Sequence, residues 1–224
     1  MIAPLFHLPN ATLGMYAQAQ GVAVRVRVKA QSTEDAQKLI APVETELRRL
    51  VGEYIWGVDD QALEEVVGKE MRQQGLTLAT MESCTGGLLA HTITQVPGSS
   101  HYFKGGVVAY TKEMKIAGGV DPDLIRKYGV VSALVAQDMA RAAREGMGAD
   151  LGIGITGVAG PEEVEGNPVG TVHIGLAHGG GTLHFSRRYP SQRALVKQRA
   201  TMQALMELWT LLKQTKGMGS ENLG

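Results

Sequence analysis

The chain has 224 residues, 44% of them hydrophobic, so it is long enough for one full domain and a smaller one. Its 22 basic residues balance its 22 acidic ones, which gives no electrostatic reason to expect nucleic acid or an anionic membrane as a partner. A single cysteine excludes an internal disulfide. Because residues 1–12 do not resemble a signal peptide and no apolar stretch reaches roughly 18 residues, we expect a cytoplasmic protein.

The first elements in chain order lie within residues 1–57. Valines alternate with charged residues over residues 21–30, the pattern of a strand with one buried face. Ser32 then provides an N-cap for a helix, which we expect Pro42 to kink or divide. Residues 53–56 resemble a short strand. We interpret this segment as a partial β-α-β module, the remnant of a larger protein.

A second unit, expected over residues 58–214, alternates strands and helices. Asp59 or Asp60 is the expected N-cap of its first helix, which runs to about Gln74. The later strands are expected near residues 76–82, 106–111, 150–155, 170–177 and 182–188, and the helices near 86–95, 112–118, 122–127, 132–146 and 191–214. The sequence therefore predicts a three-layer α/β/α fold with a mixed, mostly parallel sheet, preceded by a small α+β module and followed by a disordered tail at 215–224.

The stretch at residues 81–90, Met-Glu-Ser-Cys-Thr-Gly-Gly-Leu-Leu-Ala, lies where a predicted strand leads into a predicted helix. Ser83 is there either the cap of the helix or a nucleophile at the end of a strand. The unpaired N–H groups of a helix start would suit an oxyanion or a phosphate. Cys84 is a rival nucleophile without a histidine at a suitable spacing; its alternative role is that of a small buried hydrophobic residue.

Two further stretches also end predicted strands. One places Tyr110 at its carboxyl end and Lys115 on the helix that follows, and sites in α/β sheets form at such ends. A buried Lys115 with a lowered pKa could act as the base for Ser83, with Tyr110 relaying the proton or orienting the serine; alternatively, Tyr110 packs and Lys115 is a solvated charge. The other is the Gly-rich loop at 154–161, with Thr156 at its mouth, which can offer backbone N–H groups to a phosphate.

Several patterns argue against other functions. His173, His178 and His184 have no carboxylate or cysteine at ligand spacing, so we expect no metal and no other cofactor. Residues 1–57 lack the Gly-x-x-Gly clamp that RNA-binding KH modules use. We therefore expect neither a nucleic-acid partner nor a membrane partner.

Six motifs in order resemble the CinA family, specifically its C-terminal nicotinamide-nucleotide amidase domain, over about residues 59–214. They are Glu-Ser-Cys-Thr-Gly-Gly-Leu-Leu-Ala (82–90), Pro-Gly-Ser-Ser-His-Tyr-Phe (97–103), Gly-Gly-Val-Val-Ala-Tyr-Thr-Lys-Glu-Met-Lys (105–115), Tyr-Gly-Val-Val-Ser (128–132), Gly-Ile-Thr-Gly-Val-Ala-Gly-Pro (154–161) and Pro-Val-Gly-Thr-Val (168–172). Gly-Glu-Tyr-Ile-Trp-Gly (52–57) resembles the join between the family's small middle module and this domain. The nucleotide-pyrophosphatase activity of the domain that precedes this module in full-length members is not expected of this chain.

The resemblance implies hydrolysis of nicotinamide mononucleotide to nicotinic acid mononucleotide and ammonia, a step of NAD recycling. Carried over by motif, Ser83 is the nucleophile, and Tyr110 and Lys115 handle its proton. The mechanism implied is acyl transfer, with the oxyanion held by backbone N–H groups. The implied substrate contacts come from two glycine-rich turns and the last helix: Thr85, Gly86 and Gly87, then Thr156, Gly157 and Gly160, and finally Arg193, as a phosphate or subunit contact.

The chain departs from the family pattern after Ala-Gly-Pro. The family usually carries a Gly-Gly pair and a Lys there, whereas this chain has Glu162-Glu163-Val164-Glu165-Gly166-Asn167, whose carboxylates would repel a phosphate. Lys197 also stands where the last helix often carries Arg. The acidic loop favours a second possibility, a non-catalytic nucleotide-binding or regulatory protein of the same fold linked to competence and DNA damage. For either function, the expected partners are a small-molecule nucleotide and further copies of the chain, as a homo-oligomer.

Overall fold

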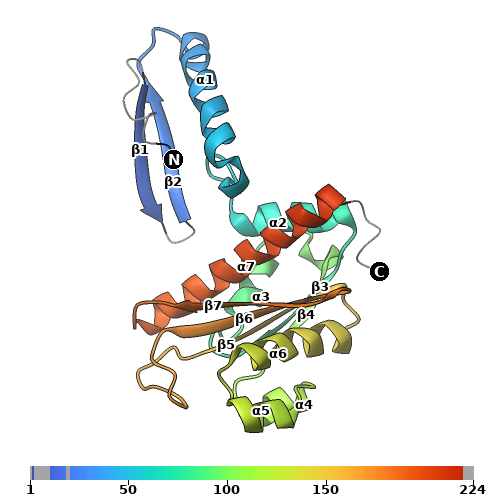
Figure 1. Cartoon of the computed structure of the whole chain (residues 1–224). Helices are drawn as coiled ribbons and strands as arrows, with labels where there is room; N and C mark the ends of the chain where they lie inside the picture. Colours follow the sequence, from blue (N-terminus) through green and yellow to red (C-terminus); the bar gives the residue numbers. More distant parts are fainter. Residues whose placement is uncertain (1, 3–10, 19–20, 219–224) are drawn as a thin grey trace. The chain divides into compact units, whose positions relative to one another are not determined.

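The computed structural model describes residues 2, 11–18 and 21–218, and the remaining residues lie outside the described part (Figure 1). The chain divides into two compact units, Met1–Gln61 and Ala62–Gly224. The predicted disordered tail at 215–224 is wrong at its start, because a helix continues to Met218; the rest of that tail lies outside the described residues.

The first unit pairs two antiparallel strands, β1 (Ala11–Gln18) and β2 (Gly21–Val28), with the helix α1 (Thr33–Val51). Ser32 is its N-cap, as predicted: its Oγ accepts a hydrogen bond from the N–H of Asp35 at 3.1 Å. A small core forms where Leu13, Val43 and Leu47 pack together.

Three features of this unit differ from what the sequence led us to expect. Pro42 does not divide α1, which is one helix across it. A short 3-10 helix, η2 (Gly52–Tyr54), stands where a strand was expected, so the order is β-β-α rather than β-α-β. β1 was not predicted, although Ala11, Leu13, Met15 and Ala17 alternate with Thr12, Gly14, Tyr16 and Gln18; it pairs with β2 along its whole length.

The second unit is built on a five-stranded mixed sheet, which confirms the predicted fold class. Its order is β4-β3-β5-β6-β7; β3 runs parallel to β4 and β5, and the pairs β5–β6 and β6–β7 are antiparallel. The strands are β3 (Leu78–Glu82), β4 (Phe103–Val108), β5 (Leu151–Gly157), β6 (Thr171–His178) and β7 (Gly181–Arg188). The carboxyl ends of β3, β4 and β5 therefore meet at one edge of the sheet.

Helices cover both faces of this sheet (Figure 1). One layer holds α4 (Lys112–Ala117), α5 (Pro122–Tyr128) and α6 (Ala133–Gly146); the other holds α2 (Leu63–Gln74), α3 (Leu88–Thr94) and α7 (Arg193–Met218), with the short η3 (Ser99–His101) nearby. The expected cap at Asp59 or Asp60 is wrong, since α2 starts after Ala62, whose N–H donates to Glu65 Oε2 at 3.3 Å. None of the helices in the described ranges is long and apolar enough to cross a membrane.

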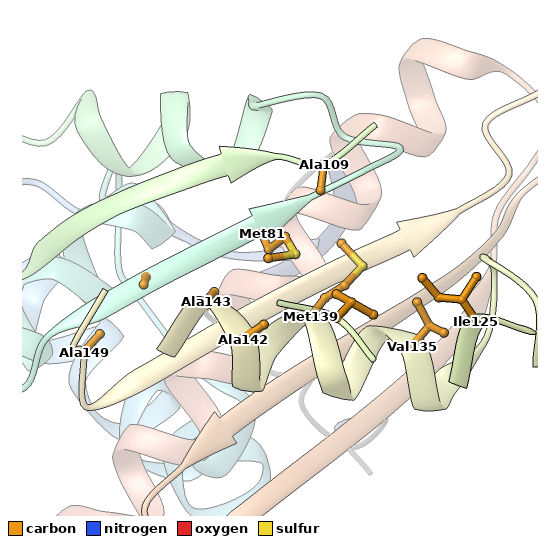
Figure 2. Packing of buried hydrophobic residues seen from close by; sticks show 10 residues of the cluster. Met81, Ala109, Ile125, Val135, Met139, Ala142, Ala143 and Ala149 are labelled. Carbon is orange, nitrogen blue, oxygen red and sulfur yellow. The ribbon is translucent and has the colours of Figure 1, made fainter. Parts of the chain in front are cut away.

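The core between the sheet and α6 orients the residues that matter for the site. Figure 2 shows Met81 of β3 and Ala109 lying over Met139 and Ala142 of α6. Because side chains alternate along a strand, Met81 facing α6 sends its neighbour Glu82 toward the α3 side. Glu82 thus lies on the α3 side of the sheet, whereas Ser83, one residue further along, faces the layer that holds α4 and α6.

Candidate active site

Ser83 follows β3 directly and is held by both neighbouring strands. Its N–H donates to the carbonyl of Ile155 at 2.9 Å, and the carbonyl of Glu82 accepts from the N–H of Ala109 at 2.8 Å. Both bonds prolong the parallel ladders of the sheet beyond the regular strands. The position of the Ser83 hydroxyl is therefore set by the centre of the sheet rather than by a mobile loop.

Lys115 reaches Ser83 from α4, whose N-cap Thr111 accepts a hydrogen bond from the N–H of Met114 at 3.3 Å. The Lys115 side chain is 2% exposed, and its Nζ donates to Ser83 Oγ at 2.9 Å and to the carbonyl of Ala109 at 3.1 Å. Burial lowers the pKa of Lys115. The structure thus brings together a hydroxyl and an amine that is easier to deprotonate than an exposed lysine.

Cys84, the rival nucleophile, lies beside this pair but is 5% exposed. Burial raises the pKa of its thiol to about 12, so the thiolate is scarce at neutral pH. The structure favours the alternative role, a small buried hydrophobic residue.

Glu82 was assigned no role from the sequence, yet it organises the turn after β3. Its buried carboxylate accepts hydrogen bonds from the N–H groups of Gly87 and Leu89, both at 3.0 Å, and of Ala90 at 2.8 Å. An internal anion thus already occupies the start of α3. The only sequence signal was an acidic residue shortly before a helix, and its position on a strand concealed the contact.

The predicted contacts Thr85, Gly86 and Gly87 are consequently not equivalent. The N–H of Gly86 donates to the carbonyl of Ser83 at 3.0 Å, and that of Gly87 is bound to Glu82. In the described part of the chain, the N–H groups of Cys84 and Thr85 have no acceptor in another residue, and the buried hydroxyl of Thr85 has no partner. The donors left for an oxyanion are those of Cys84 and Thr85.

Tyr110 and Arg193 form a second cluster. Tyr110 is 55% exposed, and its hydroxyl accepts a hydrogen bond from Arg193 Nη2 at 2.5 Å, whereas the hydrogen bonds of Lys115 Nζ go to Ser83 and Ala109. Arg193 Nη1 also donates to the carbonyl of Gly160 at 2.6 Å. Arg193 therefore links the Gly-rich loop at 154–161 to Tyr110.

Lys197 lies one turn further along α7 and is half-buried. Its Nζ would lie 3.5 Å from a Cβ at Gly86, so it reaches the turn after Ser83. Among the described residues, neither Arg193 nor Lys197 has a carboxylate within ion-pair distance. Two cations without an internal anion thus lie close to the Ser83 turn and to Tyr110.

Thr156 and Gly157 end β5 inside the protein. Thr156 is buried and its Oγ1 donates to the carbonyl of Val130 at 2.8 Å, while a Cβ at Gly157 would press on the carbonyl of Thr171. Over residues 11–18 and 21–218, no group of three or more His, Cys, Asp or Glu side chains could hold a metal ion.

Comparison with known families assigns both units. The model of the CinA C-terminal domain matches residues 60–212, and that of the damage-inducible protein CinA KH domain matches residues 1–57. A competence-damage inducible protein of Moorella thermoacetica is 43% identical over 214 residues, which are 95% of this chain and 52% of that protein. A CinA-like protein of Acaryochloris marina is 43% identical over 211 residues, 92% of this chain and 50% of its own length. The chain thus spans about half the length of these curated relatives.

Solved structures agree with this assignment. A CinA superfamily protein from Klebsiella pneumoniae has a TM-score of 0.66 and 30% identity, covering 68% of this chain and 97% of its own. The competence/damage inducible protein CihA from Agrobacterium tumefaciens has a TM-score of 0.62 and 31% identity, covering 70% of this chain and all of its own (100%).

Proposed function

The chain belongs to the CinA family, and from this membership and the site geometry we propose that it is an amidohydrolase that deamidates nicotinamide mononucleotide through Ser83. The observation that carries the proposal is the 2.9 Å hydrogen bond between Lys115 Nζ and Ser83 Oγ in a buried setting. A serine paired with a lysine of lowered pKa is an activated nucleophile.

Acylation follows from the positions of these atoms. Neutral Lys115 takes the proton of Ser83 Oγ as the oxygen attacks the carboxamide carbon of the pyridine. The N–H groups of Cys84 and Thr85 stabilise the tetrahedral oxyanion. Lys115 then gives the proton to the leaving nitrogen, and ammonia departs, which leaves a nicotinoyl ester on Ser83.

Deacylation uses the same groups in reverse. Lys115 takes a proton from water, the resulting hydroxide attacks the ester, and the proton returns to Ser83 Oγ as nicotinic acid mononucleotide leaves. Tyr110, held by Arg193, serves in this proposal to orient the bound substrate rather than to relay protons.

The phosphate of the substrate is assigned to Arg193 and Lys197 rather than to the start of α3. Glu82 already holds the N–H groups of Gly87, Leu89 and Ala90, so an added anion there would meet a carboxylate. The two cations of α7 lack such a counter-charge. This arrangement supports an anionic substrate over a neutral amide.

The first test measures ammonia release from nicotinamide mononucleotide by the purified chain in the presence of EDTA. We expect turnover, and with nicotinamide riboside, which lacks the phosphate, a kcat/KM lower by about tenfold or more. Thermal shift with the mononucleotide runs in parallel. Binding without ammonia release would contradict the amidase and support the non-catalytic, regulatory alternative.

The phosphate assignment is tested by Lys197→Gln. We expect its KM for the mononucleotide to rise about three- to tenfold, since one charge-assisted contact is lost, while the riboside is handled as by the wild type. Lys69→Gln, an exposed charge on α2, is the matched control. An equal loss for both substrates in Lys197→Gln would contradict a role for Lys197 in holding the phosphate.

A further inference from the structure

Glu165 lies in the loop that joins β5 to β6 and has an unusual backbone conformation, with φ of +52°. Its Oε2 accepts hydrogen bonds from the N–H of Val130 at 2.6 Å and of Val131 at 3.4 Å. A positive φ is uncommon for a residue with a side chain, so these contacts compensate for an unfavourable conformation.

The turn that Glu165 contacts is shaped to receive it. Gly129 has φ of +79°, and a Cβ there would collide with Glu165 Oε2. The carbonyl of Val131 accepts a second bond from the same loop, donated by Asn167 Nδ2 at 3.1 Å. The next residue along the chain, Ser132, is the N-cap of α6, so the loop is fastened at the point where that helix begins.

The other end of the loop is tied to the proposed site. The carbonyl of Gly160 accepts from Arg193, which also holds Tyr110. The loop at residues 160–167 is therefore attached on one side to Tyr110 through Arg193 and on the other to the turn at 129–131. A loop fixed at both ends is part of the rigid support of the site rather than a flexible lid.

Glu165 also acts electrostatically on the buried amine. Two titratable groups, Cys84 and then Glu165, raise the pKa of Lys115. The thiol of Cys84 is neutral near pH 7, because burial raises its pKa to about 12. The carboxylate of Glu165 raises the pKa of Lys115 against the larger, lowering effect of burial. Glu163 and Glu165 are both exposed, and of the two only Glu165 is among the groups that raise the pKa of Lys115.

We propose that Glu165 is a positioning residue of the Ser83–Lys115 site, which fastens the loop at 160–167 to the turn at 129–131 and places a negative charge that acts on Lys115. The acidic loop, which the sequence suggested would hinder the phosphate, thus provides the carboxylate that fastens the loop bound to Arg193, and its charge favours the protonated form of Lys115. The kinetic consequences rest on the proposed amidase function, whereas the charge on Lys115 does not.

The first experiment is therefore independent of activity. The full chain is labelled with [ε-¹³C]lysine, the Lys115 signal is assigned by its loss in Lys115→Met, and its titration is followed by NMR. We expect Glu165→Gln to move the midpoint of Lys115 to lower pH and the matched control Glu163→Gln to leave it in place. Equal midpoints for wild type and Glu165→Gln would overturn the electrostatic part of the proposal.

The second experiment follows kcat/KM against pH with nicotinamide mononucleotide. Glu165→Gln should shift the acid limb to lower pH, because Lys115 becomes neutral at lower pH when the carboxylate is removed. Asn167→Ala, which loosens the loop and keeps the charge, should lower kcat/KM about three- to tenfold without moving that limb. If both variants keep the wild-type kcat/KM and the wild-type acid limb, the proposal is overturned.

Two results distinguish a failure of the amidase proposal from a failure of the role proposed for Glu165. If the wild type releases no ammonia, the amidase proposal fails, and the NMR titration still decides the role of Glu165. If Glu165→Gln does not fold, Glu165→Asp replaces it: a shorter acid that keeps the charge should lose the bonds to Val130 and Val131 yet hold the Lys115 midpoint closer to that of the wild type. A Lys115 midpoint that lies well below the wild-type value in Glu165→Asp, although the negative charge is kept, would contradict the assigned charge.

Discussion

Burial of Lys115 makes its amine easier to deprotonate and, by the same effect, destabilises the fold. Its amine is buried against Ser83 and Ala109, and no carboxylate lies within ion-pair distance of it among the described residues. Burial lowers its pKa from the ordinary 10.5, so the unfolded chain binds the proton more tightly than the folded one. The protonated lysine therefore destabilises the fold, and that cost decreases as pH rises between the lowered pKa and 10.5.

Lys115→Met tests this cost through its pH dependence. Methionine removes the charge and keeps much of the volume, so we expect the gain in free energy of unfolding over the wild type to be larger at pH 7 than at pH 10. Chemical denaturation at both pH values measures it, with the exposed Lys69→Met as control. A difference between variant and wild type that is the same at both pH values would show that Lys115 titrates like an exposed lysine.

At the scale of elements, the strands and helices near the site were largely predictable. Patterns of apolar residues located β3 to β7 within a few residues, and the rule that sites form at strand ends placed Ser83 near Lys115, 32 positions away in sequence. What the sequence did not reveal depends on contacts between distant segments. Glu82 binds the start of α3, and Glu165 binds the turn at 129–131. Neither contact produces a recognisable pattern in the local sequence.

The cap that Glu82 provides to α3 leads to a prediction about that element. Glu82→Gln replaces one acceptor oxygen with an amide that cannot accept from the N–H groups, so we expect a loss of about 2 kcal/mol in stability and a lower kcat. Glu65→Gln is the control, because Glu65 makes a similar bond to Ala62 at the exposed start of α2. Urea unfolding of both variants provides the comparison; equal, small losses would mean that the buried cap contributes little.

At the scale of the whole molecule, the first unit matches a KH domain model, a name associated with RNA-binding modules, whereas the balanced charge and the missing Gly-x-x-Gly clamp predict no nucleic-acid partner. The absence of the clamp removes the feature that holds the nucleotide backbone in such modules.

Fluorescence anisotropy with single-stranded RNA tests this expectation. At about 0.15 M salt, we expect no saturable binding up to protein concentrations of about 10 μM, since the chain has no net positive charge to neutralise phosphates. Saturable binding in the low micromolar range would contradict the expectation and direct attention to β2, with Arg25 and Arg27.

The identity of the nucleophile is the central claim for the molecule, and one side-by-side assay tests it most directly. Ammonia release from nicotinamide mononucleotide is measured for the wild type, Ser83→Ala and Cys84→Ala, each checked for thermal unfolding. We expect Ser83→Ala to lose at least about a thousandfold in kcat, and Cys84→Ala, which removes a thiol that is neutral near pH 7, to retain activity near that of the wild type. Full activity in Ser83→Ala with loss in Cys84→Ala would contradict the account.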